Sequence, residues 1–322
     1  MKNQADPLLL VILGPTASGK TALSLSLAEK LNGEIVSCDS VAVYREFEVG
    51  TAKPSPRERA RVPHYMIDIA APDEEITAGD YARRARAALN EIKARGRLPI
   101  VVGGTGLYLR ALINGLFAGP ERSNELRDRL RAKAEAGSGE ELHRVLSRLD
   151  PGAATKIHPN DTPKLIRAIE VCLLAGERMS ELWQHGRDPL TGFRILRVGL
   201  DPVRNGLYER INRRCAQMFE RGLVDETREL LKCYRPPDFA IDSDPRPVAK
   251  ALGSLGYRQA AAFLMDKMNL SESMDAAQQG HRNYAKRQMT WFRREPEVQW
   301  FSGFGNDEQV QETVFSWVRG RR

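Results

Sequence analysis

Eight consecutive residues near the start of the chain match the pattern G-x-x-x-x-G-K-[ST], and they constrain the fold more than any other feature. They are Gly14, Pro15, Thr16, Ala17, Ser18, Gly19, Lys20 and Thr21. The pattern lies between a short apolar run, 8–13, and a segment with leucines at helical spacing, 21–31. In that context it predicts a loop whose backbone N–H groups surround phosphate oxygens, with Lys20 adding charge and Thr21 placed to bind Mg²⁺. The sequence therefore predicts a di- or triphosphate site, and the alternative is a chance match in a tight turn.

The first hundred residues alternate between strand and helix patterns. Short apolar runs at 8–13 and 99–102 predict strands that are buried on both faces, and 34–37 is predicted to be a second short strand. Helical patterns at 21–31 and 79–95 separate them. Strands that alternate with helices are typical of a parallel sheet. The predicted fold class is therefore α/β, with a P-loop NTPase-like parallel sheet as the core and helices on both faces.

From about residue 120 the pattern becomes almost entirely helical. Helices are predicted at 125–136, 142–149, 162–176, 208–232, 248–265 and 274–294, with a return strand at 193–200. A single core rarely grows beyond ~250–300 residues, so a chain of this length should contain a second unit. We predict an α/β core made of 1–117 and 195–322 with C-terminal helices. The intervening segment, 118–194, is predicted to be an all-helical insertion domain.

Charge and cysteine content restrict the partners and the compartment. The 49 Lys and Arg exceed the 42 Asp and Glu, which gives a net charge of +7. Such a balance is compatible with a polyanionic partner. The four cysteines form no C-x-x-C pair, so neither a zinc site nor a disulfide framework is predicted. Because no run approaches the ~20 apolar residues of a membrane span, we expect a cytoplasmic protein with no membrane partner, and a monomer by default.

Two polar residues follow predicted strands and are candidates for chemistry. Asp39 comes after the strand at 34–37, where a carboxylate could bind metal or accept a proton, although capping of the next turn is the alternative. Thr105 follows Gly103-Gly104 after the strand at 99–102, and its hydroxyl could position a substrate or cap a helix. An ATPase would carry a metal-binding aspartate there. Its absence argues against ATP hydrolysis.

Cationic residues form two further groups. Arg210 and Arg214 share a helix face at i, i+4, so one of them could clamp a phosphate, or both could be solvated surface. A late helix interleaves cations with aromatics, which suits an RNA surface, although aromatics at helical spacing are more often core. Its members are Arg282, Tyr284, Lys286, Arg287, Trp291, Phe292, Arg293 and Arg294. The five histidines show no metal-ligand spacing.

Taken together, these segments closely resemble bacterial tRNA dimethylallyltransferases, the isopentenyl-tRNA transferases. The matching segments follow the family order over about residues 8–301, namely 14–21, Asp39-Ser40 with Tyr44, Gly-Thr-Ala-Lys-Pro at 50–54, Val-Gly-Gly-Thr at 102–105 with Tyr108, His-Pro-Asn-Asp at 158–161, Gly-Tyr-Arg at 256–258, and Ala-Lys-Arg-Gln with Thr-Trp-Phe at 285–292. The chain departs from many relatives at His281, where they have threonine, and at Ser254-Leu255. These departures put only local tRNA contacts in doubt.

The resemblance implies transfer of a dimethylallyl group from dimethylallyl diphosphate to the N6 amine of the adenine just 3′ of the anticodon of a tRNA (position 37). It implies that Asp39 is the general base and that Thr16, Lys20 and Arg214 hold the diphosphate with Mg²⁺. Thr105 would lie where the amine and the prenyl carbon meet. The implied tRNA contacts are Asp39, Ser40, Val41, Ala42, Thr105, Arg127, Pro163, Lys164, Leu165, Ile166, Arg167, Gly253, Ser254, Leu255, Gly256, Tyr257 and Arg258. The insertion domain would bind the anticodon stem-loop.

Three other functions use some of the same features. A small-molecule or nucleotide kinase would use the phosphate loop. The long insertion argues against a kinase, and so does the absence of a metal-binding aspartate at the end of the strand at 99–102. An adenylate isopentenyltransferase acting on free nucleotides would need little machinery for an anticodon stem. A non-catalytic RNA-binding module would tolerate loss of Asp39. Labelled dimethylallyl diphosphate offered with tRNA, AMP and ATP separates these hypotheses.

Overall fold

The computed structural model describes residues 6–117, 119–136, 139–184, 186–237 and 245–322. They form two compact units. Unit 1 comprises Met1–Leu112 and Leu190–Arg322, and unit 2 comprises Ile113–Pro189. The sequence analysis placed an insertion at 118–194.

Unit 1 is built on a six-stranded sheet with the order β3-β2-β4-β1-β5-β6. The strands are β1 (Leu8–Leu13), β2 (Gly33–Cys38), β3 (His64–Tyr65), β4 (Leu98–Gly103), β5 (Arg194–Asp201) and β6 (Val298–Ser302). Every neighbouring pair is parallel. The predicted parallel α/β sheet is confirmed, whereas β3 and β6 were not predicted.

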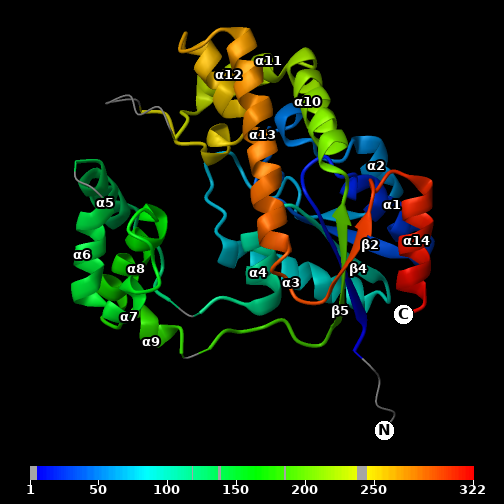
Figure 1. Cartoon of the computed structure of the whole chain (residues 1–322), viewed down its shortest axis with the longest axis horizontal. Helices are drawn as coiled ribbons and strands as arrows, with labels where there is room; N and C mark the ends of the chain where they lie inside the picture. Colours follow the sequence, from blue (N-terminus) through cyan, green and yellow to red (C-terminus); the bar gives the residue numbers. More distant parts are fainter. Residues whose placement is uncertain (1–5, 118, 137–138, 185, 238–244) are drawn as a thin grey trace. The chain divides into compact units, whose positions relative to one another are not determined.

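Alternation along β1 separates the two faces of the sheet. Leu8, Leu10 and Ile12 pack in one core cluster with residues of α1 (Lys20–Leu31) and α14 (Glu308–Arg319). The helix α3 (Ala78–Ala94) packs against β2 and β4, and its Tyr81 ring stacks on Tyr108 of α4 (Gly106–Asn114) with 4.3 Å between centroids. Each fully buried leucine contributes about 1.5–3 kcal/mol relative to an exposed one. Helices therefore lie on both sides of the sheet (Figure 1).

Two long helices predicted from periodicity are each divided in the structure. The stretch 208–232 forms α10 (Arg204–Glu220) and α11 (Leu223–Cys233), with Gly222 between them at a φ of 96°. The stretch 248–265 forms a 3₁₀ turn, η2 (Lys250–Gly253), and α12 (Tyr257–Leu264). Glycine adopts positive φ without steric cost, so it ends a helix that apolar spacing alone would continue. The predictions of two unbroken helices were wrong.

The remaining elements of unit 1 are two short ones near its N-terminal end and one long helix. They are η1 (Val49–Thr51), α2 (Pro56–Arg61) and α13 (Leu270–Phe292). The helix α13 packs against α10 and α12. It begins at a capping box in which Asn269 accepts from the N–H of Glu272.

Unit 2 is helical, and its helices are α5 (Asn124–Ala136), α6 (Gly139–Leu149), α7 (Pro151–Ala154), α8 (Thr162–Ala175) and α9 (Met179–Leu182). Its core includes Leu142, Leu146, Leu165 and Ile169, which are completely buried. Asp161 caps α8 by accepting from the N–H of Lys164, as its position before a proline predicts. Among the described helices of the whole chain, none combines the length and apolar character that a bilayer span requires.

Candidate active site

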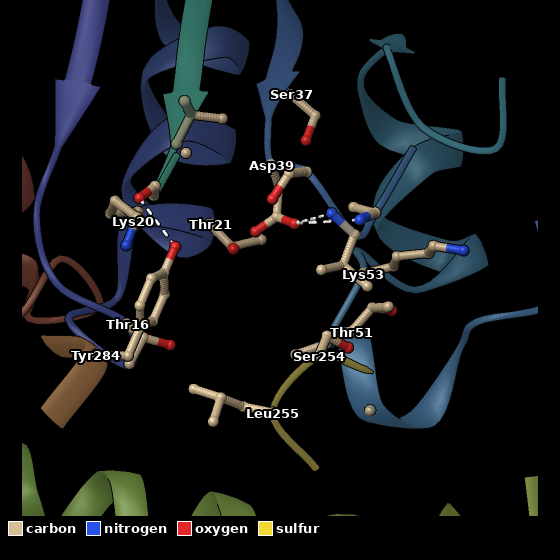
Figure 2. Close-up of a pocket in the computed structure, with 18 of the residues that line it drawn as sticks. Thr16, Lys20, Thr21, Ser37, Asp39, Thr51, Lys53, Ser254, Leu255 and Tyr284 are labelled. Carbon is tan, nitrogen blue, oxygen red and sulfur yellow. Dashed lines mark hydrogen bonds between the residues drawn. The ribbon is translucent and has the colours of Figure 1, made fainter. Parts of the chain in front are cut away.

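The carboxyl ends of three adjacent strands meet at a cavity of about 470 Å³ in unit 1. The phosphate loop follows β1, Asp39 follows β2, and Gly103-Gly104 ends β4. Figure 2 shows side chains from these segments around the opening. The rest of the wall includes Gly50–Pro54, Arg214, Gly253–Leu255, Arg258, His281, Tyr284 and Gln288. This is where an open parallel sheet binds its ligands, and the volume suits a small molecule.

The phosphate loop has the backbone conformation of an anion cradle. Gly14, Ala17 and Gly19 have φ values of 151°, 64° and 88°. A Cβ atom on Gly19 would lie 2.7 Å from the backbone nitrogen of Gly305, which donates a hydrogen bond to the Ser18 carbonyl. The loop is therefore held from behind by the turn that follows β6. Its strained alanine is typical of a loop whose shape serves ligand binding.

Two cations lie in the cavity wall beside this loop. Lys20 Nζ donates to the carbonyl oxygens of Gly14 at 2.9 Å and Pro15 at 2.7 Å. Arg214 donates to Thr16 Oγ1. Burial, followed by the nearby charge of Arg214, lowers the pKa of Lys20 from 10.5 to about 7. Burial also lowers the pKa of Arg214.

Within the described residues, neither of these cations has a carboxylate at ion-pair distance. Enclosing two neighbouring cations is costly, because each loses hydration, and the nearby charge of Asp39 offsets only part of this cost. Bound phosphate oxygens would replace the lost hydration of Lys20 and Arg214 and screen their mutual repulsion. The arrangement therefore suits an anionic ligand.

The carboxylate of Asp39 is held by the turn that follows β2. Its Oδ1 accepts from the backbone N–H groups of Val41 at 2.8 Å and Ala42 at 3.1 Å, as the dashed lines in Figure 2 show. No described residue donates to Oδ2. Asp39 does cap the following turn, and the same side chain also faces the cavity. One oxygen thus orients the carboxylate while the other is available to accept a proton.

Thr105 lies directly behind the Asp39 turn. Its Oγ1 accepts from the N–H of Ser40 at 3.0 Å, and its own N–H donates to the Cys38 carbonyl at 3.1 Å. Burial raises the pKa of the Cys38 thiol to about 12, so this cysteine is inert. Thr105 is not among the residues that line the main cavity. In this structure its hydroxyl holds the turn that carries the carboxylate.

One face of α13 forms a wall that the sequence analysis did not assign to the site. Gln288 accepts from the N–H of Thr16 at 2.7 Å and donates to the Gly104 carbonyl at 2.9 Å. Tyr284 donates to the same carbonyl at 3.1 Å. Burial and the charge of Arg214 lower the pKa of His281 to about 3, so its ring is neutral. The sequence feature that could have indicated this wall is the i, i+3, i+7 spacing of these three residues, which places them on one face of a helix that also carries buried alanines.

Lys53 closes the side of the cavity opposite the phosphate loop. Its side chain is 1% exposed, and its Nζ lies 2.6 Å from Asp68 and 3.2 Å from Glu48. It also donates to the Tyr44 carbonyl at 2.7 Å. This cation is already neutralised. It orders the segment Gly50–Pro54 and offers little charge to a ligand.

The predicted site residues are only partly brought together. Those around the cavity are Thr16, Lys20, Thr21, Asp39, Ser40, Val41, Ala42, Arg214, Gly253, Ser254, Leu255 and Arg258. Tyr257 lies behind the wall and is completely buried. Arg127 and Pro163–Arg167 belong to unit 2.

Within unit 2, several of the predicted tRNA contacts have structural partners. Leu165 and Ile166 are 0% and 5% exposed, so their side chains form part of the core of unit 2, and their contact with tRNA stays a prediction. Arg127 donates to Glu170 through Nε at 2.8 Å and Nη2 at 2.6 Å, and Arg167 adds a third bond at 2.6 Å. Burial alone would raise the pKa of Glu170, but these bonds lower it to about 2.

Comparison with known proteins decides the family. The model described as IPP transferase matches residues 42–295. A protein from Koribacter versatilis named tRNA dimethylallyltransferase is 62% identical over 306 residues, which cover 95% of this chain and 96% of that one. The chain belongs to the IPP transferase family. A tRNA dimethylallyltransferase from Geobacter metallireducens is 42% identical over 98% of this chain and 99% of its own length.

Solved structures of other IPP transferases have the same fold. A tRNA isopentenylpyrophosphate transferase from Bacillus halodurans has a TM-score of 0.69 at 37% identity, covering 98% of this chain and 96% of that chain. A eukaryotic dimethylallyltransferase acting on tRNA has a TM-score of 0.78 at 27% identity, covering 98% and 77%. The predicted fold class and family are therefore confirmed, and this IPP transferase is an enzyme.

The donor set of the IPP transferase site suits a hard cation shared with a ligand. Figure 2 shows Thr21 and Asp39 projecting into the cavity, so one hydroxyl and one carboxylate are available there. Among the described residues there is no group of three or more His, Cys, Asp or Glu that could hold a metal by itself. Mg²⁺ commonly takes one or two protein oxygens and completes its shell with phosphate and water. The residues present fit that habit.

Proposed function

We propose that this IPP transferase moves a dimethylallyl group from dimethylallyl diphosphate to the N6 amine of the adenosine 3′ of the anticodon in a tRNA, and releases diphosphate. The observation that carries the proposal is the shared cavity of Asp39 and the two cations without carboxylate partners, Lys20 and Arg214. A base and an anion site on one small cavity match a reaction that removes a proton and expels a diphosphate.

The phosphate loop is the proposed donor site. Thr16, Lys20 and Arg214 would bind the diphosphate and stabilise the negative charge that grows as the carbon–oxygen bond breaks. Lys20 would exchange its two carbonyl partners for phosphate oxygens and become fully protonated. Mg²⁺, held by Thr21 together with the diphosphate oxygens, would neutralise part of the leaving group's charge. Substrates that fill the cavity would exclude water, which would otherwise capture the electron-poor allylic carbon.

Asp39 is the proposed general base. The lone pair of an adenine amine is delocalised into the ring, so the amine is a poor nucleophile until its proton is removed. Asp39 Oδ2 is free to take that proton while Oδ1 remains on the two backbone N–H groups. Thr105, through Ser40, would keep the carboxylate turn in place as the bond forms. General-base assistance of this kind contributes about 10²–10⁴-fold.

The proposed acceptor is a flipped base from a tRNA loop. Unstacking a loop base costs less than unstacking one in a duplex, which favours an anticodon loop over a helical stem. Ser40–Ala42, Gly253–Leu255 and Arg258 line the cavity and are the proposed contacts to that loop. The exposed cations of unit 2, such as Arg129 and Lys164, are proposed to contact the stem. We propose that the activity is cytoplasmic, because the proposed acceptor is a tRNA, and that one chain suffices.

The direct test is an acceptor competition with purified protein. Labelled dimethylallyl diphosphate and Mg²⁺ are incubated with bulk tRNA, AMP and ATP, separately and together. We expect label in tRNA alone, in a nucleoside that co-migrates with N6-dimethylallyladenosine. Label in AMP or ATP would instead indicate an adenylate isopentenyltransferase, and ATP turnover without prenyl transfer would indicate a kinase.

A further inference from the structure

One carboxylate outside the cavity joins three separate segments of unit 1. Glu226 of α11 accepts from the backbone N–H of Glu48 at 3.1 Å and of Val49 at 2.9 Å. It also accepts from the hydroxyl of Tyr257, the first residue of α12. Neither Glu226 nor Tyr257 lines the cavity. Three donors on one carboxylate form a stronger junction than any single neutral hydrogen bond.

Tyr257 extends this junction to the next residue of the η1 turn. Its hydroxyl accepts from the N–H of Gly50 at 3.1 Å while donating to Glu226. Its ring is completely buried and meets the ring of Phe47 edge-on, with 4.9 Å between centroids. A Cβ atom on Gly50 would lie 2.4 Å from the Tyr257 ring, so the backbone is packed directly on the aromatic face. Burial and Glu226 raise the pKa of Tyr257, which stays protonated as a donor.

The segments joined in this way are two walls of the cavity. Gly50–Pro54 continues from the η1 turn, and Gly253–Leu255 ends two residues before Tyr257. Figure 2 shows Thr51, Ser254 and Leu255 on the same side of the opening, across from Lys20 and Thr16. These walls are about 200 residues apart in the chain, and the Glu226 junction connects them.

We propose that Glu226 and Tyr257 are positioning residues that fix the separation of these two walls and thereby shape the entrance for the acceptor base. The inference rests on the proposed function, because it assigns this side of the cavity to the tRNA and the phosphate-loop side to the donor. Loss of the junction should let Gly50–Pro54 and Gly253–Leu255 move apart. The donor side should be unaffected, since Thr16, Lys20 and Arg214 are held by the phosphate loop and α13.

The test separates acceptor from donor effects in three variants. Tyr257→Phe removes only the hydroxyl, and Glu226→Gln removes the charge while keeping the shape. Glu229→Gln is the matched control, because Glu229 lies one turn further on the same helix, is exposed, and bonds only to Lys232 among the described residues. We measure KM and kcat for tRNA, the Kd for dimethylallyl diphosphate, and the melting temperature.

We expect the KM for tRNA to rise about 10- to 100-fold in Tyr257→Phe and Glu226→Gln, the range expected for losing a hydrogen bond to a charged group. The donor Kd should stay within about twofold of wild type, and Glu229→Gln should match wild type throughout. An unchanged tRNA KM in Tyr257→Phe would overturn the inference even if Glu226→Gln did not fold. So would a fall in kcat and melting temperature with both substrate constants unchanged, because that pattern describes a purely structural junction. If the proposed function itself is wrong, wild type and Glu229→Gln would also fail to modify tRNA, and the inference would fall with it.

Discussion

The two sides of the cavity treat their lysines in opposite ways. Lys20, on the phosphate-loop side, bonds only to backbone carbonyls among the described residues, and its pKa is lowered to about 7. Lys53, on the other side, is almost completely buried between Asp68 and Glu48. A paired cation holds the wall in place, whereas a cation without an ion-pair partner among the described residues is available to bind an anionic ligand. The comparison teaches that the charge of a pocket cannot be judged by counting its basic residues.

Asp39 lies between these two sides, and replacing it should have the largest effect. In Asp39→Asn we expect prenyl transfer to fall about 10²–10⁴-fold, because the amide cannot accept the adenine proton. The amide oxygen can still accept from Val41 and Ala42, so the turn should persist. Single-turnover transfer and tRNA binding are measured side by side. Normal transfer in this variant would remove Asp39 from the role of base.

Lys20→Met tests whether the lysine of the phosphate-loop side binds the donor. We expect kcat/KM for dimethylallyl diphosphate to fall about 10²–10³-fold, the usual cost of losing one charged donor to a developing anion. The free energy of unfolding should change by less than about 1 kcal/mol, because the lost hydrogen bonds are offset by relief from desolvation. Steady-state kinetics and urea unfolding provide both numbers. A strongly destabilised variant with normal donor affinity would mean that Lys20 stabilises the fold and does not bind the diphosphate.

Lys53→Met should produce the reverse pattern. We expect a loss of about 1–3 kcal/mol of stability, because Asp68 keeps Arg59 but loses its buried partner, and the Tyr44 carbonyl loses a donor. The donor Kd should change by less than about threefold. Urea unfolding and equilibrium binding of labelled dimethylallyl diphosphate check this. A loss of donor affinity as large as that of Lys20→Met would mean that both lysines bind the diphosphate.

Glu170 of unit 2 is paired with two arginines, much as Lys53 is paired with acidic residues. Replacing it should have the smallest effect on binding of the donor. Glu170→Gln should cost about 1–3 kcal/mol of stability at pH 7, with Glu125→Gln as the exposed control. The folded-state pKa of about 2 lies below 4.5, so this stabilisation is present above pH 4.5 and is lost as the pH falls toward 2. The gap in stability between wild type and the variant should therefore narrow on acidification. Donor Kd should not change.

The parts of the fold that were predictable depend on local patterns. The strand β1 and most of β4 are continuous apolar runs, and the loop after β1 has the glycine and lysine spacing of a phosphate loop. β3 has only two residues, too few for periodicity to show. The division at Gly222 depends on a single residue with positive φ within an otherwise helical stretch.

A site residue could be predicted where its own position in the sequence indicates its role. It could not be predicted where the role depends on a contact with a residue distant in the sequence. Asp39 and Lys20 are indicated by their positions after strands. That Lys53 is neutralised depends on Asp68, and that Gln288 bridges the phosphate loop and β4 depends on how α13 packs. For Leu165 and Ile166, the apolar spacing of their helix already indicated core, and the structure agrees with that spacing.

If Lys20 binds the diphosphate, the protein should take up a proton when the donor binds, and calorimetry measures this uptake. Dimethylallyl diphosphate is titrated calorimetrically into the protein with Mg²⁺ at pH 8, in two buffers of different ionisation enthalpy. Because free Lys20 has a pKa of about 7 and a bound anion raises it, we predict uptake of close to one proton by wild type and almost none by Lys20→Met. Tight binding by wild type with no proton uptake would contradict the account.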